Sequence, residues 1–124
     1  MNNLKLSTLS KTWIFDVDGT IVKHNGHLKG GDEILPNVKD FFARKIAATD
    51  KVILLTAREE KYIEQLKIFL QEEGICFDHL ISNLPHGERI LVNDKKPSGL
   101  PTAFAVNVQR DGILNINVDL DPTL

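Results

Sequence analysis

Two aspartates separated by one residue, Asp16 and Asp18, form the pattern in this 124-residue chain that is most typical of a catalytic or cation-binding site. They follow a short aromatic and β-branched run at residues 13–15, which has the composition of a buried strand. In extended backbone, residues i and i+2 point to the same side, so both carboxylates face one way. Two such charges repel each other unless a cation lies between them or one carboxylate takes a proton. Gly19 permits the positive φ that a sharp turn away from the sheet requires.

Two further apolar runs also end in polar side chains. Residues 52–55 end at Thr56, and residues 89–92 end at Asn93 and Asp94. In an open parallel sheet the carboxyl ends of the strands lie at one edge, and ligands bind there. The sequence therefore predicts that the paired aspartates, the threonine and the last aspartate meet in one site, although they are far apart along the chain.

Amphipathic stretches separate these apolar runs. Residues 22–33 are rich in Gly, His, Lys and Asn, which predicts a loop that we call the flap. Apolar spacing typical of helices follows over residues 38–46 and again over residues 62–70, where Gly74 is placed to end the second helix. A further short strand is predicted at residues 79–81.

The last part of the chain predicts an antiparallel pair. Residues 102–108 and 113–119 alternate around Asp111-Gly112, a sequence typical of a tight β-hairpin turn. Together with the strands and helices before it, this pattern predicts an α/β fold with a mainly parallel sheet covered on both faces and a C-terminal β-hairpin at one edge. Residues 1–10 are expected to be a flexible tail, which leaves residues 11–124 as one domain.

Composition narrows the class of protein. Apolar residues make up 42% of the chain and charged residues 26%, which is typical of a soluble globular protein. The formal net charge of −2 argues against a dedicated nucleic-acid binder, and no apolar run approaches the roughly 20 residues that a membrane-spanning helix needs. Cys76 is the only cysteine, so no internal disulfide forms, and residues 1–11 lack the apolar core of a secretory signal. We therefore expect a cytoplasmic protein.

The sequence around the paired aspartates resembles a known family. Residues 14–20, Ile-Phe-Asp-Val-Asp-Gly-Thr, resemble the first motif of the haloacid dehalogenase (HAD) superfamily, whose commonest members are magnesium-dependent phosphatases. Residues 54–58, Leu-Leu-Thr-Ala-Arg, look like its second motif, and residues 91–94, Leu-Val-Asn-Asp, look like its fourth. The resemblance implies a Rossmann-like three-layer α/β/α core. It also implies a member without a cap domain, because the two positions where caps are inserted hold only a loop and one helix.

The resemblance assigns roles in the hydrolysis of a phosphomonoester. Asp16 would be the nucleophile that forms an aspartyl-phosphate, and Asp18 would act as general acid and then as general base. Thr56 would donate its hydroxyl to a phosphoryl oxygen. The cation of the third motif has no plain match. Arg89 is the first candidate for it and His86 is the nearest alternative, with Arg58 and Lys95 as more remote ones.

The same resemblance implies a magnesium ion and a set of substrate contacts. The carboxylates of Asp16 and Asp94 and the backbone carbonyl of Asp18 would hold Mg²⁺, with other oxygen ligands completing its shell. Asn93 stands where the family often has a glycine or a second acid, which bears on metal affinity. The residues expected to contact the substrate are Gly19, Thr20, Thr56, Ala57 and Arg58.

The implied substrate is a small phosphorylated metabolite such as a sugar phosphate, because small capless members resemble phosphatases of surface-polysaccharide metabolism. The flap or a second copy of the chain would cover the open site. Two other functions stay open. One is a HAD-like module that binds magnesium or phosphate without turnover. The other is a phospho-receiver domain, which also uses Thr-Ala and Lys-Pro steps, but no strand between residues 21 and 55 ends in the Asp that it needs.

Overall fold

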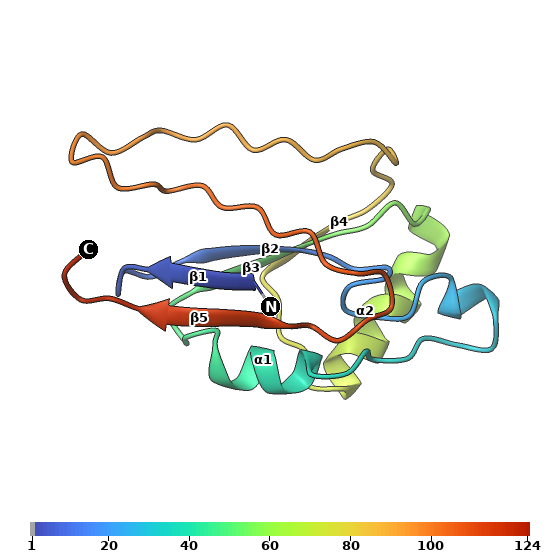
Figure 1. Ribbon diagram of the computed structural model, residues 1–124. Helices are drawn as coiled ribbons and strands as arrows, with labels where there is room; N and C mark the ends of the chain where they lie inside the picture. Colours follow the sequence, from blue (N-terminus) through green and yellow to red (C-terminus); the bar gives the residue numbers. More distant parts are fainter. Residues whose placement is uncertain (1) are drawn as a thin grey trace.

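Three of the apolar runs form a parallel sheet in the computed structural model, which describes residues 2–124 (Figure 1). The strands are β2 (Thr12–Asp16), β3 (Lys51–Leu55) and β4 (His79–Ile81), in the order β2-β3-β4. In the register of the sheet Asp16 aligns with Leu55, and Leu55 aligns with Ile81. The carboxyl ends of the three strands therefore lie at one edge, as the α/β pattern predicts.

The helices expected between the strands are also present. They are α1 (Val38–Arg44) and α2 (Ile63–Glu72), and single 3-10 turns occur at η1 (Gly26–Leu28) in the flap and at η2 (Glu60–Tyr62) before α2. Gly74 follows α2 with a φ of 77°, which confirms its predicted place at the helix end. None of the helices within residues 2–124 has the length and apolarity needed to cross a membrane.

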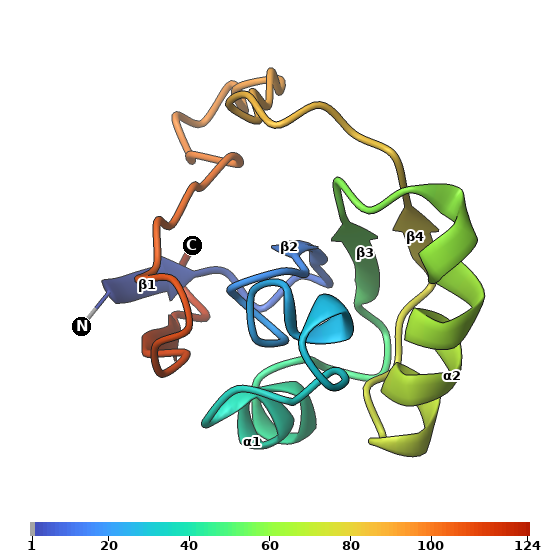
Figure 2. The same ribbon diagram turned by 90° about the vertical axis from the view of Figure 1, so that its right-hand side faces the viewer.

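Both α-helices lie on the same side of the three-stranded sheet (Figures 1 and 2). Burial alternates along the strands, so that Val52 and Leu54 are buried while Ile14 and Ile81 remain 47% and 46% exposed. The prediction of helices on both faces is therefore wrong for the part of the chain that the structure describes, and the three-layer core is not formed there. The buried apolar residues that join sheet, turn and helices are Phe15, Val17, Ile21, Val22, Leu35, Val38, Phe41, Val52, Leu54, Ile63, Leu66, Leu70, Ile75 and Leu114.

The two ends of the chain form a second, smaller sheet. Strand β1 (Asn2–Leu6) pairs in parallel with β5 (Ile116–Leu120), with Asn2 aligned to Ile116 and Leu6 to Leu120. The segment predicted as a flexible tail therefore contains a strand over residues 2–6, and Met1 lies outside the described residues. Sequence periodicity alone did not indicate this pairing because its two partners lie at opposite ends of the chain.

Residues 82–115, which we call the long segment, contain no strand. The segment leads away from the helices and then returns, so that Leu114 is buried in the core (Figure 1). The strand predicted at residues 89–92 is not formed. Ile90, Leu91 and Val92 are 85%, 57% and 90% exposed, so no neighbouring strand or helix covers this apolar run. An apolar run becomes a buried strand only where a partner supplies hydrogen bonds and a packed face. Neither is present here.

The predicted C-terminal hairpin is also wrong, although its turn exists. Asp111 has a φ of 58°, and the N–H of Gly112 donates to the carbonyl of Gln109 at 3.1 Å. Residues 102–108 are not a strand, and β5 pairs with β1 instead of with them. The turn therefore redirects the chain without joining two antiparallel strands.

Candidate active site

The turn after β2 places the paired aspartates at the carboxyl edge of the sheet. The N–H of Val17 donates to the carbonyl of Leu55 at 3.0 Å, which extends the pairing of β2 and β3 by one residue. Gly19 then adopts a φ of 87°, the positive value that the sequence predicts. An added Cβ at this glycine would lie 3.2 Å from the Cγ of Arg110. Gly19 therefore permits both the turn and the close approach of the long segment.

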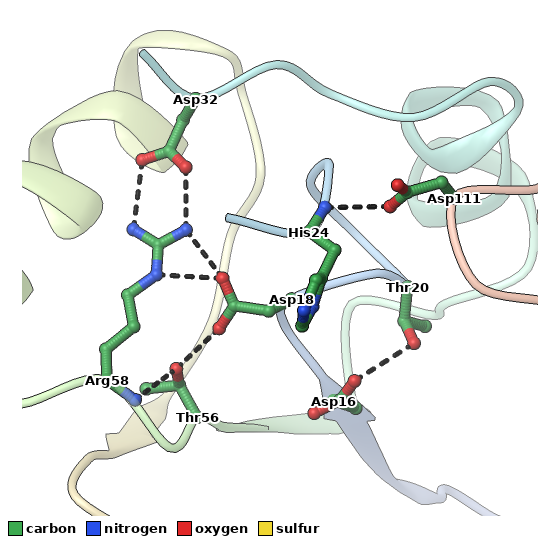
Figure 3. A network of polar contacts seen from close by, with 8 residues as sticks. All are labelled: Asp16, Asp18, Thr20, His24, Asp32, Thr56, Arg58 and Asp111. Carbon is green, nitrogen blue, oxygen red and sulfur yellow. Dashed lines mark hydrogen bonds and ion pairs between the residues drawn. The ribbon is translucent and has the colours of Figure 1, made fainter. Parts of the chain in front are cut away.

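Asp18 is held on both of its carboxylate oxygens (Figure 3). The hydroxyl of Thr56, which is fully buried directly after β3, donates to Oδ2 at 2.8 Å. The Nε–H of Arg58 donates to Oδ1 at 2.9 Å, and the backbone N–H of Arg58 donates to the Thr56 hydroxyl at 3.1 Å. These contacts fix the orientation of the Asp18 carboxylate relative to the sheet.

Asp16 is more accessible and has a different cation. Its carboxylate accepts a hydrogen bond from the Thr20 hydroxyl at 3.2 Å, and the Nη1–H of Arg89 donates to it at 2.9 Å. The side chains of Asp16 and Arg89 are 37% and 38% exposed. Partial burial raises the pKa of Asp16, the nearby charge of Asp18 adds to this rise, and Arg89 and Thr20 oppose it. The two aspartates therefore differ in access and in partners.

The arginine expected from the sequence lies beside the expected nucleophile. Arg89 belongs to the long segment, 73 positions after Asp16, and still forms the ion pair with it. His86, the alternative candidate, has no hydrogen bond or ion pair among the contacts found within residues 2–124. The geometry therefore favours Arg89 over His86 as the cation at the site.

Of the residues predicted to contact the substrate, some lie on the loops that follow β2 and β3, whereas the side chain of Arg58 is buried. Gly19 and Thr20 lie on the turn that follows Asp16, and Ala57 is the second residue after the end of β3. The side chain of Arg58 is only 3% exposed, and its guanidinium is bonded to carboxylates. Arg58 therefore holds other side chains of the site in this arrangement, and its burial keeps a ligand from its guanidinium.

Asp94 does not join the other acids. It lies in the long segment, where its backbone carbonyl accepts a hydrogen bond from the Thr102 hydroxyl at 2.5 Å. The side-chain amide of Asn93 donates to the same hydroxyl at 3.0 Å. Both residues line a cavity of about 210 Å³ that includes Lys95 and Pro101 but neither Asp16 nor Asp18. The predicted convergence therefore holds for the aspartate pair and Thr56, and not for Asp94.

The placement of the acids decides whether the site fits the implied magnesium ion. Carboxylate oxygens are suitable ligands for Mg²⁺, which prefers about six oxygen ligands in octahedral geometry, with water completing the shell. Here Asp16 and Asp18 are paired with guanidinium groups, and the third carboxylate lies elsewhere. Within residues 2–124, no three His, Cys, Asp or Glu side chains are grouped so that they could hold a metal ion. The residues as arranged do not fit the ion.

Two acids in the neighbourhood have no counterpart in the sequence prediction. Asp32, in the flap, accepts hydrogen bonds from the Nη1–H and Nη2–H of Arg58 at 3.1 and 2.6 Å. Asp111, in the turn of the long segment, accepts a hydrogen bond from the backbone N–H of His24 at 2.7 Å. Neither follows an apolar run, which was the signal that identified the other site residues. Both tie the flap to other parts of the chain (Figure 3).

The rings of the flap histidines, His24 and His27, lie near Asp18, Asp32 and Arg58 and make no hydrogen bond or ion pair within the described residues. His27 lies edge-on to Tyr62, with ring centroids 4.8 Å apart. Burial lowers the pKa of His27, and the charge of Arg58 lowers it further. The Nδ1 atoms of His24 and His27 are buried and have no hydrogen-bond partner. A ligand cannot reach these two nitrogens unless the flap moves.

Comparison of the sequence and the structure with protein families, curated proteins and solved structures gives no match.

Proposed function

We propose that this protein is a phosphomonoester hydrolase that works through an aspartyl-phosphate on Asp16. One observation carries the proposal: the strand-end pair of aspartates is divided into an accessible carboxylate and a fixed one. Asp16 is partly exposed beside the cation of Arg89, whereas Asp18 is held by Thr56 and Arg58. A nucleophile needs access to its substrate, and a proton donor needs a fixed position.

In the first step, an Asp16 oxygen forms a bond to phosphorus while the bond from phosphorus to the leaving oxygen breaks. In the role that the motif implies, Asp18 supplies the proton to that leaving oxygen, so the alcohol departs as a neutral molecule. In the arrangement described above both Asp18 oxygens accept hydrogen bonds, so Asp18 must take up that proton before this step. In the second step, the Asp18 carboxylate takes a proton from water. The water oxygen bonds to phosphorus as the bond to Asp16 breaks, and inorganic phosphate is released.

The cation next to Asp16 addresses the main electrostatic difficulty of this chemistry. An anionic nucleophile and an anionic phosphoryl group repel each other, and positioned cations lower this repulsion in phosphoryl transfer. The Nη1 of Arg89 lies 2.9 Å from Asp16 Oδ1, in reach of a phosphoryl group bound there. Arg89 therefore has the place and the charge to bind the phosphoryl oxygens.

The proposed substrate class rests on the resemblance of the motifs to the HAD superfamily. We propose a small phosphorylated metabolite, such as a sugar phosphate of surface-polysaccharide biosynthesis, in the cytoplasm. One specific observation favours a second candidate, a phosphate-binding module without turnover. That observation is the separation of Asp94 from the aspartate pair, which leaves the set of carboxylates expected from the sequence incomplete.

Release of inorganic phosphate from sugar phosphates, nucleotides and p-nitrophenyl phosphate tests the proposal. Assays with and without Mg²⁺ test the requirement that the motifs imply and that the arrangement of the acids does not support. We expect Asp16→Asn to abolish release while the far-ultraviolet circular dichroism stays unchanged. Asp119→Asn, which removes an exposed carboxylate in β5, is the matched control and keeps full activity. Undiminished release by the Asp16 variant contradicts the assignment of the nucleophile. Phosphate binding by the wild-type protein without any turnover supports the module instead.

A further inference from the structure

Asp32 connects the flap to the acid that the proposed reaction uses as proton donor. Its two oxygens accept hydrogen bonds from two different nitrogens of Arg58, at 3.1 and 2.6 Å. The same guanidinium reaches Asp18, with the Nη2 of Arg58 2.8 Å from Oδ1. One arginine therefore joins an acid of the flap to an acid of the strand-end turn (Figure 3).

This three-residue cluster is nearly inaccessible to solvent. The side chains of Arg58, Asp32 and Asp18 are 3%, 8% and 16% exposed. A buried guanidinium needs its charge balanced and its N–H groups bonded, because an unpaired buried charge is strongly unfavourable. Planar two-point contact between carboxylate and guanidinium also restricts the orientation of both partners. Asp32 therefore determines how the guanidinium of Arg58 is oriented.

The contact between Asp32 and Arg58 holds one end of the flap. The N–H of Lys23 donates to the carbonyl of Glu33 at 2.9 Å, which joins the two ends of the flap. Asp32 lies directly beside that junction and points from it to Arg58 (Figure 3). Asp18 and His27 also lie near the charge of Arg58. Asp18 contacts the Nε and Nη2 of Arg58 with one oxygen, whereas Asp32 pairs both of its oxygens with two nitrogens of the guanidinium.

We propose that Asp32 is a positioning residue that sets the place of Asp18 through Arg58, so that closure of the flap and alignment of the proton donor are one event. The catalytic part of this inference rests on the proposed function. The structural part, the coupling of Asp32 to Arg58 and of Arg58 to Asp18, does not. Two measurements separate these parts.

The structural coupling is measured by nuclear magnetic resonance on the Arg58 Nε–H, which donates to Asp18. The resonance is assigned by its absence in Arg58→Lys. We expect Asp32→Asn to shift or broaden it, and Asp32→Glu, which keeps the carboxylate, to restore most of it. Glu33→Gln removes the same charge from the neighbouring exposed position and leaves the resonance unchanged. An unchanged Arg58 resonance in folded Asp32→Asn overturns the proposal.

The catalytic consequence is measured with the same variants on the phosphate ester that the wild-type protein hydrolyses best. We expect Asp32→Asn to lower kcat about 10- to 100-fold with KM changed less than about threefold, because misplacing a catalytic group affects the chemical step. Glu33→Gln keeps the wild-type kcat, and Asp32→Glu recovers part of the loss. In an Arg58→Gln background, Asp32→Asn causes no further loss, because the residue acts through Arg58. An equal loss in both backgrounds contradicts the proposed route.

The two measurements also distinguish failure of this inference from failure of the proposed function. If the wild-type protein releases no phosphate but the Arg58 resonance responds to Asp32→Asn, the hydrolase proposal fails and the coupling is supported. If the protein is an active phosphatase and neither the resonance nor kcat responds, the positioning role is overturned. Circular dichroism at the assay temperature verifies that each variant is folded.

Discussion

Asp50 connects the beginnings of β2 and β3, and replacing it by asparagine tests how strongly this link stabilises the sheet that carries the site. Its side chain is nearly buried, and it accepts three hydrogen bonds. Oδ1 accepts one from the backbone N–H of Lys11 at 2.9 Å. Oδ2 accepts two, from the indole N–H of Trp13 at 2.9 Å and from the N–H of Ala47 at 3.0 Å.

An asparagine amide has only one oxygen, so Asp50→Asn cannot satisfy all three donors. In its best orientation the oxygen faces Trp13 and Ala47, and the NH₂ group faces the N–H of Lys11, which loses its acceptor. A hydrogen bond to a charged group contributes about 1.5–3 kcal/mol, so we expect a loss of about 2 kcal/mol at neutral pH. For a chain of this length that loss lowers Tm by roughly 8 °C.

The stability lost in Asp50→Asn should be smaller at acidic pH than at neutral pH. Burial alone would raise the pKa of Asp50, but the N–H donors of Lys11, Trp13 and Ala47 outweigh burial and lower it below the ordinary value of 3.8. A carboxyl group with a lower pKa in the folded state stabilises the fold above its unfolded pKa, and this contribution is lost as pH falls through the folded value. The difference in the free energy of unfolding between wild type and Asp50→Asn is therefore largest at neutral pH and becomes smaller as pH falls below 3.8.

Urea unfolding measures the effect, followed by circular dichroism and by the fluorescence of Trp13, the only tryptophan. Asp119→Asn is the control for loss of an exposed carboxylate and changes the free energy of unfolding by less than about 0.5 kcal/mol. A loss of less than about 0.5 kcal/mol in Asp50→Asn refutes the reasoning from three donors. A loss that is as large at about pH 2 as at about pH 7 refutes the assigned charge dependence.

Three further substitutions test the site directly. Arg89→Met removes the cation 2.9 Å from Asp16 and should lower kcat/KM about 100-fold, whereas Arg44→Met, on the surface of α1, should not. Burial raises the pKa of Asp16 above 3.8 and Arg89 opposes that rise, so the activity of the wild-type protein should increase with pH as Asp16 loses its proton. In Arg89→Met this acidic limb of the pH–activity profile should move to higher pH. A limb at unchanged pH contradicts the assignment of Asp16 as nucleophile. Thr56→Val leaves the Asp18 Oδ2 and the backbone N–H of Arg58 without the Thr56 hydroxyl as partner, and should lower the free energy of unfolding by about 1–3 kcal/mol. Thr56→Ser keeps the hydroxyl and should largely preserve the free energy of unfolding in the same urea titration. Gly19→Ala places a side chain at a φ of 87° and should cost about 1–2 kcal/mol by the same measurement, and a neutral result would show that the turn relaxes.

The parts of the fold that the sequence predicts well are those set by local pattern. Strands β2, β3 and β4 coincide with short apolar runs, and the helices coincide with apolar spacing near 3.6 residues. The meeting of Asp16, Asp18 and Thr56 follows from one topological rule, that parallel strands end at a common edge. These features require only knowledge of neighbouring residues and of the direction of the strands.

The parts that sequence reasoning misses depend on distant partners. The pairing of β1 with β5 joins the two ends of the chain, and the run at residues 89–92 stays uncovered despite a strand-like composition. Asp32 has no strand or motif beside it, and only the three-dimensional approach of Arg58 gives it a role. Composition states what a segment can form, whereas the presence of a partner determines what it does form.

The parallel pairing of β1 with β5 has a consequence for synthesis on the ribosome. Asn2 aligns with Ile116, so β1 leaves the ribosome long before its partner exists. At translation speeds of about 5–20 residues per second, the N-terminal strand waits on the order of 5–20 s with its edges unpaired. The nascent chain can assemble β2, β3, β4 and both helices during that delay, whereas the terminal sheet forms only after β5 has emerged. Contacts so distant along the chain close slowly, so we expect the joining of the two ends to be the last event of folding.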